Sequence, residues 1–438
     1  MSAAVNPSAP RQKPGNRRPI PPSWIFGGLS ALLASGYGVL FTVVADYRDA
    51  YGISETAIGW LIGLGFIVAF FAQTLIAPIG DRGHARNLIR VGVLLNIIGI
   101  LMLGFGESLE VLLAGRVISG LGIGTAIPAI RRIVILADPE NLGENLGRLL
   151  SADVFGFAMG PALSALLVGP FGLAAPYVIV AAATLVMLAI AESFHVEERV
   201  DTSGQRLAFD LLKSRIVAGA VVMGGGVFLM IGAFDALWDV VHDDLGTADW
   251  MSNLGITLFA IPLVVFGPFS GRLSQRVGPF KVGGLGLIAG AFFMSAYGQL
   301  PSGEWIFAFT MGHALTDGLT VSASGVAVAM AVPEERQSGA QGLIGATQAL
   351  AGGITAVVIA TIYQEHGRAA AYTTGAIGML IFTAIAMWLG VDFWLRGGHR
   401  KALAESLDES SEEAAPRPDR VDSITLATST RRPRLRRP

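Results

Sequence analysis

His313 and Asp317 are two ionisable residues four positions apart inside an apolar segment at about residues 304–331. In a helix this spacing places both side chains on one face. An Asp at the centre of a membrane helix costs roughly 2.5–3.5 kcal/mol on insertion scales, so such residues are candidates for function. Asp317 is therefore our first candidate for a group that binds and releases a proton. The structural alternative is a protonated or paired Asp317 beside a His313 that satisfies a helix contact.

Three further ionisable residues within apolar segments are candidates for proton coupling: Arg116, Asp153 and Asp235. Arg116 could shift the proton affinity of a facing acid, hold an anionic substrate or extend towards the nearer membrane surface. Asp153 could take part in proton coupling or be a structural partner of Arg131 or Arg132. Asp235 is either a proton-coupling group or part of a solvated vestibule.

Only membrane-spanning helices can position these residues. Hydrophobic residues make up 52% of the 438-residue chain and charged residues 15%, and the mean hydropathy is +0.58. A soluble domain carries roughly 25% charged residues. Stretches of about 20 apolar residues cross a hydrocarbon core of roughly 30 Å. We find twelve, at approximately 24–45, 58–79, 88–106, 109–130, 146–168, 173–192, 216–238, 251–271, 281–300, 304–331, 339–363 and 370–395.

The lysines and arginines predict which side of the membrane each loop faces. Twelve spans place both termini on one side, and that side carries all of the 31 Lys and Arg residues except Arg48, Arg116 and Arg368. Cytoplasmic loops are rich in Lys and Arg. We therefore expect both termini in the cytoplasm and, since we find no eukaryotic targeting pattern, a multi-pass protein of the bacterial inner membrane.

The two halves of the chain repeat at an offset of 194 residues, at which Asp49 matches Asp243 and Pro139-Glu140 matches Pro333-Glu334. A polar stretch divides the spans into six and six. We expect five regions: a cytoplasmic arm, a six-helix bundle, a cytoplasmic linker, a second six-helix bundle and a disordered cytoplasmic tail, at 1–23, 24–192, 193–215, 216–396 and 397–438.

A charged turn follows the second span and has a weaker copy after the eighth. The first copy contains Asp81, Arg82 and Arg86, and the second has Gln275 and Arg276 at the positions of Asp81 and Arg82. Acidic and basic groups at helix ends can pair in one conformation and separate in another. The turn resembles the loop 2–3 signature of the major facilitator superfamily. The resemblance implies a cytoplasmic gate, closed in the outward-facing state, for which Asp81, Arg82, Arg86 and Arg276 are the candidates.

Spans 4 and 5 carry two further resemblances to this family. Arg116 begins an Arg-x-x-x-Gly-x-Gly sequence that resembles the family's span 4 motif, whose buried arginine is linked to proton transfer. Gly147, Gly156, Gly160 and Pro161 have the spacing of the antiporter motif, although this chain ends it in Ser-Ala instead of Gly-Gly. Small residues four apart let helices approach closely, and proline bends a helix. The alternative to an antiporter motif is generic helix packing.

Six polar or aromatic residues are candidates to line a substrate cavity between the halves: Tyr37, Gln73, Asn96, Phe157, Trp238 and Gln348. The chain has no cysteine, which excludes thiol catalysis and cysteine-ligated metal sites. We find no nucleotide-binding Gly-Lys-Ser/Thr loop, and the net charge of −2 gives no nucleic-acid signature. We expect transport and not enzymatic catalysis, with no cofactor or metal.

The resemblance covers about residues 24–396 and implies an all-α membrane protein with two pseudo-symmetric six-helix bundles that work by alternating access. We expect a secondary active transporter in which the proton gradient drives export of a small, partly apolar organic compound; Na⁺ could replace the proton. The alternatives are proton-coupled import of a metabolite or organic anion, and a receptor-like protein without transport. We expect a small-molecule substrate and the lipid bilayer as partners, no nucleic acid, and a monomer.

Overall fold

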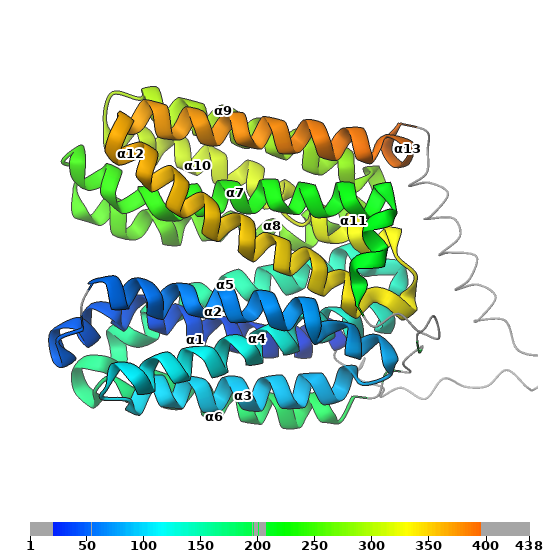
Figure 1. Ribbon diagram of the computed structural model, residues 1–438, viewed down its shortest axis with the longest axis horizontal. Coiled ribbons are helices and arrows are strands. Elements are labelled where there is room, and N and C mark those ends of the chain that lie inside the picture. The colour runs from blue at the N-terminus through cyan, green and yellow to red at the C-terminus, as the bar shows by residue number, and fades with distance from the viewer. Residues whose placement is uncertain (1–20, 54, 195, 197–199, 201–206, 396–438) are drawn as a thin grey trace, which may run out of the picture.

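The computed structural model describes residues 21–53, 55–194, 196, 200 and 207–395. Two helical bundles, one from each half of the chain, lie side by side with their helices roughly parallel to a common axis (Figure 1). Most of the predicted N-terminal arm, the predicted C-terminal tail and part of the linker lie outside the described residues.

Each bundle is built from long helices joined by short connections. The N-terminal bundle comprises α1 (Pro22–Tyr51), α2 (Glu55–Leu75), α3 (Ala85–Phe105), α4 (Leu109–Ala137), α5 (Leu142–Phe171) and α6 (Ala174–Glu192). The C-terminal bundle comprises α7 (Arg215–Asp244), α8 (Asp249–Val277), α9 (Pro279–Gln299), α10 (Gly303–Thr320), α11 (Ala323–Ala331) and α12 (Gln337–Leu389). Short helices complete the described part: η1 (Ala77–Arg82), η2 (Pro139–Asn141), η3 (Ala208–Lys213), η4 (Glu334–Arg336) and α13 (Val391–Trp394).

The last helix, α12, contains two membrane crossings. Among the described residues, 11 segments are long and apolar enough to span a membrane, and the last of them, Glu334–Leu389, has 56 residues. Gly367 interrupts α12 with φ 79° and ψ 179°, a backbone conformation that favours glycine. The predicted spans 339–363 and 370–395 begin on either side of this break, so the prediction of twelve spans is confirmed.

The two bundles touch near the end at which residues 193–215 connect them, called here the linker end. There α5 packs against α8, and the first half of α12 (337–366) packs against α2 and η1. Figure 1 shows this half of α12 running obliquely, so that its N-terminal end reaches the N-terminal bundle. At the 194-residue offset α2 corresponds to α8, and α5 corresponds to the first half of α12. The two contacts between the bundles are therefore pseudo-symmetric copies of each other.

Candidate functional site

Asp81 binds the N-terminus of α12, across the boundary between the bundles. The backbone N–H groups of Ser338 and Gly339 donate to its two carboxylate oxygens at 2.7 and 2.8 Å. The first N–H groups of a helix have no partner within the helix and carry partial positive charge, so they bind a carboxylate well. The Ser338 hydroxyl also donates to the Ala77 carbonyl at 2.7 Å. This contact joins the bundles at the linker end.

Arg132 completes the Asp81 site. Its Nη1 lies 3.0 Å from Oδ1 of Asp81 and donates at 2.7 Å to the carbonyl of Glu334 in η4, and both side chains of the ion pair are buried. The sequence did not distinguish Arg131 from Arg132 as partners for Asp153. In the structure, Arg131 approaches Asp153 at 3.9 Å, whereas Arg132 binds Asp81.

The pseudo-symmetric site carries an amide where the first carries a carboxylate. Gln275 on α8 accepts the backbone N–H of Gly143 at 2.9 Å and donates to the carbonyl of Glu140 at 2.9 Å. Beside it, Arg272 donates through Nε to Glu144 at 2.9 Å, and Arg148 also pairs with Glu144. This second contact is thus hydrogen-bonded across the bundles like the first, but its buried centre is neutral.

The three other predicted gate residues are arginines near the linker end. Arg86 donates to the carbonyl of Phe194 at the start of the linker, and Arg82 and Arg276 are exposed. Arg132 and the helix N-terminus at Ser338 were the partners that sequence reasoning missed. The 194-residue repeat makes Pro333-Glu334, just before this N-terminus, the equivalent of Pro139-Glu140, but it does not indicate that the charged turn lies opposite.

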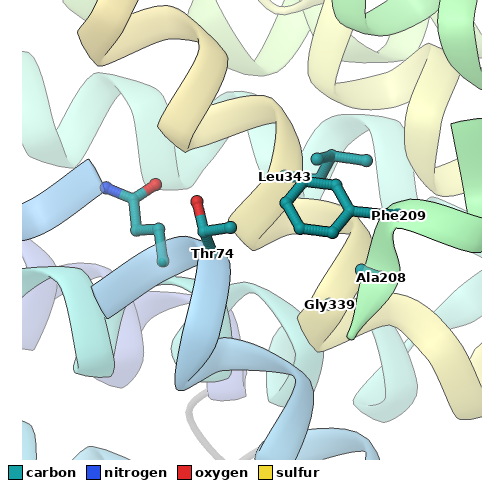
Figure 2. Close-up of a pocket in the computed structure, with 6 residues that line it drawn as sticks. Thr74, Ala208, Phe209, Gly339 and Leu343 are labelled. Carbon is teal, nitrogen blue, oxygen red and sulfur yellow. The ribbon is translucent and has the colours of Figure 1, made fainter. Parts of the chain in front are cut away.

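The linker helix η3 lies against the N-terminus of α12, beside the Asp81 site. Asp210 accepts two hydrogen bonds from Arg336, at 2.9 and 2.7 Å, and the Arg336 guanidinium holds the pKa of Asp210 below its usual range. Arg336 is the residue before α12, so this pair fixes the helix N-terminus that Asp81 binds. Figure 2 shows a narrow crevice where α2, η3 and α12 meet, lined by Gln73, Thr74, Ala208, Phe209, Gly339 and Leu343.

Glycines allow the close contact between α5 and α8. A Cβ atom on Gly147 would lie 2.0 Å from the carbonyl oxygen of Gly267, and one on Gly271 would lie 1.8 Å from that of Gly143. Gly156 and Gly160 instead face α1, where a Cβ would meet the backbone of Ala31 and Gly38 at 2.0 and 2.3 Å. The predicted antiporter motif therefore lies on two contacts, one between bundles and one within a bundle.

We expect Gly147→Ala to hinder closure of the linker end. The added methyl group overpacks the α5–α8 contact by about 1–3 kcal/mol, enough to lower the transport rate about tenfold or more. Gly169→Ala is the matched control, because it lies on the same helix and a Cβ there meets nothing within 4 Å. Transport assays on both variants test this, and equal rates in the two would contradict it.

Arg116 is buried in an aromatic cluster on the N-terminal bundle. It is 3% exposed, donates to the carbonyls of Leu61 and Ile62 at 3.1 and 3.2 Å, and lies 4.7 Å from the ring centre of Tyr37. Tyr37 in turn contacts three phenylalanines at ring-centre distances of 5.1, 5.3 and 5.7 Å: Phe41, Phe66 and Phe157. The Tyr37 ring thus covers the Arg116 guanidinium, and the cation–π interaction between them is attractive.

The two remaining acidic candidates lie in different surroundings. Asp235 on α7 is exposed and within Coulombic reach of Tyr37 across the boundary. Asp153 is partly exposed, accepts a hydrogen bond from Ser30 and pairs with Arg131, both within the N-terminal bundle. A cavity between the bundles would therefore have an aromatic wall at Tyr37 and would include Asp235.

His313 and Asp317 lie inside the C-terminal bundle. Nε2 of His313 faces Oδ1 of Asp317 at 3.6 Å, and Nδ1 of His313 lies 2.9 Å from the hydroxyl of Tyr297. Asp317 is 5% exposed. The predicted single span 304–331 is interrupted at 321–322, between α10 and α11, four residues beyond Asp317.

The cavity candidates divide into two groups. Tyr37 and Phe157 belong to the aromatic cluster, Gln73 contacts the first half of α12, and Gln348 is half-buried on that helix. The prediction that Asn96 and Trp238 line a cavity between the halves is wrong. Asn96 is fully buried where α3 packs on α4, and Trp238 stacks on Phe234 at 4.8 Å within the C-terminal bundle core, so neither faces the other bundle.

Comparison with known proteins agrees with this architecture. The family model described as "Major Facilitator Superfamily" matches residues 26–246 and again residues 216–417. The chain is similar to the MFS-type transporter YhhS of Escherichia coli, with 27% identity over 182 residues, which are 40% of this chain and 43% of that protein. The chain thus spans less than half the length of this relative.

Two further relatives are named for drug efflux. The quinolone resistance protein NorA of Staphylococcus aureus is 25% identical over 229 residues, covering 49% of this chain and 56% of NorA. The multi-drug resistance efflux pump PmrA homolog of Lactococcus lactis is 24% identical over 309 residues, covering 66% of this chain and 75% of that protein.

Solved structures share the fold at low sequence identity. The proton:xylose symporter XylE gives a TM-score of 0.68 at 14% identity, over 84% of this chain and 94% of XylE. The human organic anion transporter MFSD10 gives 0.65 at 17% identity, over 84% of this chain and 98% of its own.

Proposed function

Because the chain belongs to the major facilitator superfamily, we propose that this membrane transporter exports a small organic compound in exchange for protons. The observation that carries the proposal is Asp317, an acid 5% exposed inside a membrane-spanning bundle, apart from the surface that faces the other bundle. A carboxyl group in that position can change its charge without occupying the substrate's place. Coupling requires that the two conformations bind the proton of this group with different affinities.

The contacts at the linker end support alternating access. The hydrogen bonds and glycine contacts join surfaces of two separate bundles, whereas the buried ion pair of Asp81 and Arg132 lies within the N-terminal bundle, so the bundles can separate without unfolding. The lysine and arginine distribution assigns the linker end to the cytoplasm. With that orientation, the structure represents a state closed towards the cytoplasm, and both termini lie in the cytoplasm of a bacterial cell.

Export is favoured over import by three features together. NorA and the PmrA homolog are named for drug resistance and efflux. The span 5 glycines follow the antiporter spacing, and Gly147 lies on the contact that must open and close. Arg116, the cation that could hold an anionic metabolite, is buried beneath Tyr37 and already donates to two carbonyls.

The test measures the direction of coupled fluxes. Purified full-length protein is placed in liposomes that contain a pH-sensitive dye, and a panel of lipophilic cations, organic anions and metabolites is screened for compound-dependent proton movement. We expect opposed fluxes of proton and compound. Parallel fluxes would show symport and reduce the span 5 glycines to packing. A flux that follows a Na⁺ gradient instead would identify Na⁺, and not the proton, as the coupling ion.

A further inference from the structure

A group of buried polar side chains, hydrogen-bonded from Thr310 through Tyr297 to His313, extends through the core of the C-terminal bundle and ends beside Asp317. Tyr297 lies two residues before the end of α9, and its hydroxyl lies 2.9 Å from Nδ1 of His313 and 3.2 Å from Oγ1 of Thr310. On its other side, the His313 ring presents Nε2 to Oδ1 of Asp317 at 3.6 Å. All four side chains are buried, so bulk water does not compete with these contacts.

The hydrogen bond at one imidazole nitrogen decides what the other nitrogen can do. A neutral imidazole has one N–H donor and one acceptor nitrogen. Nδ1 is the nearer and stronger acceptor for the Tyr297 hydroxyl, compared with Oγ1 of Thr310. When Tyr297 donates to Nδ1, the ring proton is on Nε2 and points towards Asp317. An N–H aimed at a carboxyl group favours its ionised form over its protonated form.

We propose that Tyr297 is a positioning residue that holds His313 with its Nε2–H towards Asp317, and so sets the pH at which Asp317 exchanges its proton. This inference rests on the proposed function, in which Asp317 is the coupling acid. Tyr297 touches neither the proton site nor the cavity between the bundles. It acts only through the tautomer of His313.

The surroundings of His313 leave few other groups that could set its tautomer. Phe293 from α9 stacks on the ring at 4.8 Å, and Phe259 from α8 meets it edge-on at 5.7 Å. Near the same place α7 contributes Met230 and the second half of α12 contributes Met379. These four are apolar and hold the ring in place.

The titratable groups around His313 in the described part are Asp317 and Tyr297, with Tyr372 behind Tyr297 at a ring-centre distance of 5.6 Å. Asp235 is also on α7, but it faces the N-terminal bundle. Tyr372 on α12 offers a matched control, since it is a buried tyrosine at the same depth whose closest described contact is the ring of Tyr297.

The experiment titrates Asp317 directly and needs no substrate. Infrared spectra of the purified full-length protein record the carboxylic acid C=O band as a function of pH, and the Asp317 band is identified by its loss in Asp317→Asn. In Tyr297→Phe the imidazole can take its other tautomer and accept a hydrogen bond from the protonated acid, which stabilises the protonated form. We expect the midpoint of the band to move to higher pH by about one unit, a tenfold change in proton affinity. Tyr372→Phe should leave the midpoint in place.

Equal midpoints in wild type and Tyr297→Phe would overturn the proposal, as would equal shifts in the two tyrosine variants. An Asp317 band that never appears in the accessible pH range would overturn it as well. If the band shifts as expected but Asp317→Asn still couples protons to transport, the assignment of Asp317 as the coupling acid fails and the effect of Tyr297 on its titration stands.

A second measurement determines the tautomer of His313 in the wild-type chain and uses a variant only to assign the signal. Nitrogen-15 spectra of ring-labelled histidine distinguish the two tautomers, and the His313 signal is assigned by its loss in His313→Gln. We expect His313 to carry its proton on Nε2. A proton on Nδ1 would contradict the proposal.

Discussion

Replacement of Asp317 by asparagine is expected to reduce compound-dependent proton movement to the level of protein-free liposomes. Asparagine has nearly the shape of a protonated aspartic acid and cannot exchange a proton at any working pH. Asp317 is buried inside the C-terminal bundle, so the variant should keep the surface that faces the N-terminal bundle unchanged. Exchange of labelled for unlabelled compound across the membrane, which needs no net proton movement, should therefore continue.

The pair of assays, proton flux and compound exchange, separates a coupling role from simple loss of folding. Asp239→Asn is the matched control, since it makes the same replacement at an exposed position on α7. We expect the control to keep both activities. Proton movement that survives in Asp317→Asn would contradict the assignment and transfer the search to Asp153 and Asp235, the other acidic candidates for proton coupling.

The sequence predicted the elements well because membrane insertion depends on local properties. A run of about 20 apolar residues must cross the bilayer wherever it lies in the fold. The twelve spans, their division into two halves and the charged turn at Asp81 all follow from such runs and from the 194-residue repeat. The break at Gly367 also lies between the last two predicted spans, in the stretch where the hydropathy is lower.

The directions in which side chains point could not be predicted in the same way. A soluble helix shows its buried face by an apolar stripe, whereas a membrane helix is apolar on all sides and gives no such signal. Asn96 and Trp238 were therefore placed at the boundary between bundles although they lie inside their own bundles. For the same reason the sequence could not say which of Arg131 and Arg132 faces Asp153, because consecutive residues of a helix point about 100° apart.

The role of Tyr297 was invisible for a different reason. Its partner His313 is on the next helix, and nothing in the spacing of the two residues indicates a hydrogen bond. Sequence periodicity relates residues within one helix, so it paired His313 with Asp317 but could not add a residue from α9. Contacts between helices of one bundle depend on packing that the whole sequence determines.

The two contacts between bundles are symmetric in position but not in charge, and this difference gives the second large prediction. Gln275 stands at the position equivalent to Asp81, and both bind the N-terminus of a facing helix. At Asp81, however, the carboxylate also neutralises buried Arg132. Removing one partner of a buried ion pair destabilises the folded protein by about 3–5 kcal/mol, because the other charge is left uncompensated. Replacing Asp81 should therefore destabilise the closed linker end more than replacing Gln275.

We expect Asp81→Asn to shift the protein towards a conformation in which the linker end is open. The asparagine can still accept one backbone N–H, but it leaves Arg132 buried without a counter-charge, and opening exposes that arginine to water. The chain has no cysteine, so spin labels can be attached to introduced cysteines without removing native ones. The exposed residues His84 and Lys281 report the linker end, and Glu107 and Glu304 report the opposite end.

In Asp81→Asn we expect the distance between labels at His84→Cys and Lys281→Cys to increase, and that between labels at Glu107→Cys and Glu304→Cys to decrease. Asp138→Asn is the matched control, since Asp138 also lies near the linker end but accepts hydrogen bonds only from Asn141 and Asn145 among the contacts described. Distances in Asp81→Asn that match this control would show that the Asp81 carboxylate does not hold the bundles together. Closure would then depend on the glycine contacts of α5 and α8, and Gly147→Ala would become the stronger of the two variants.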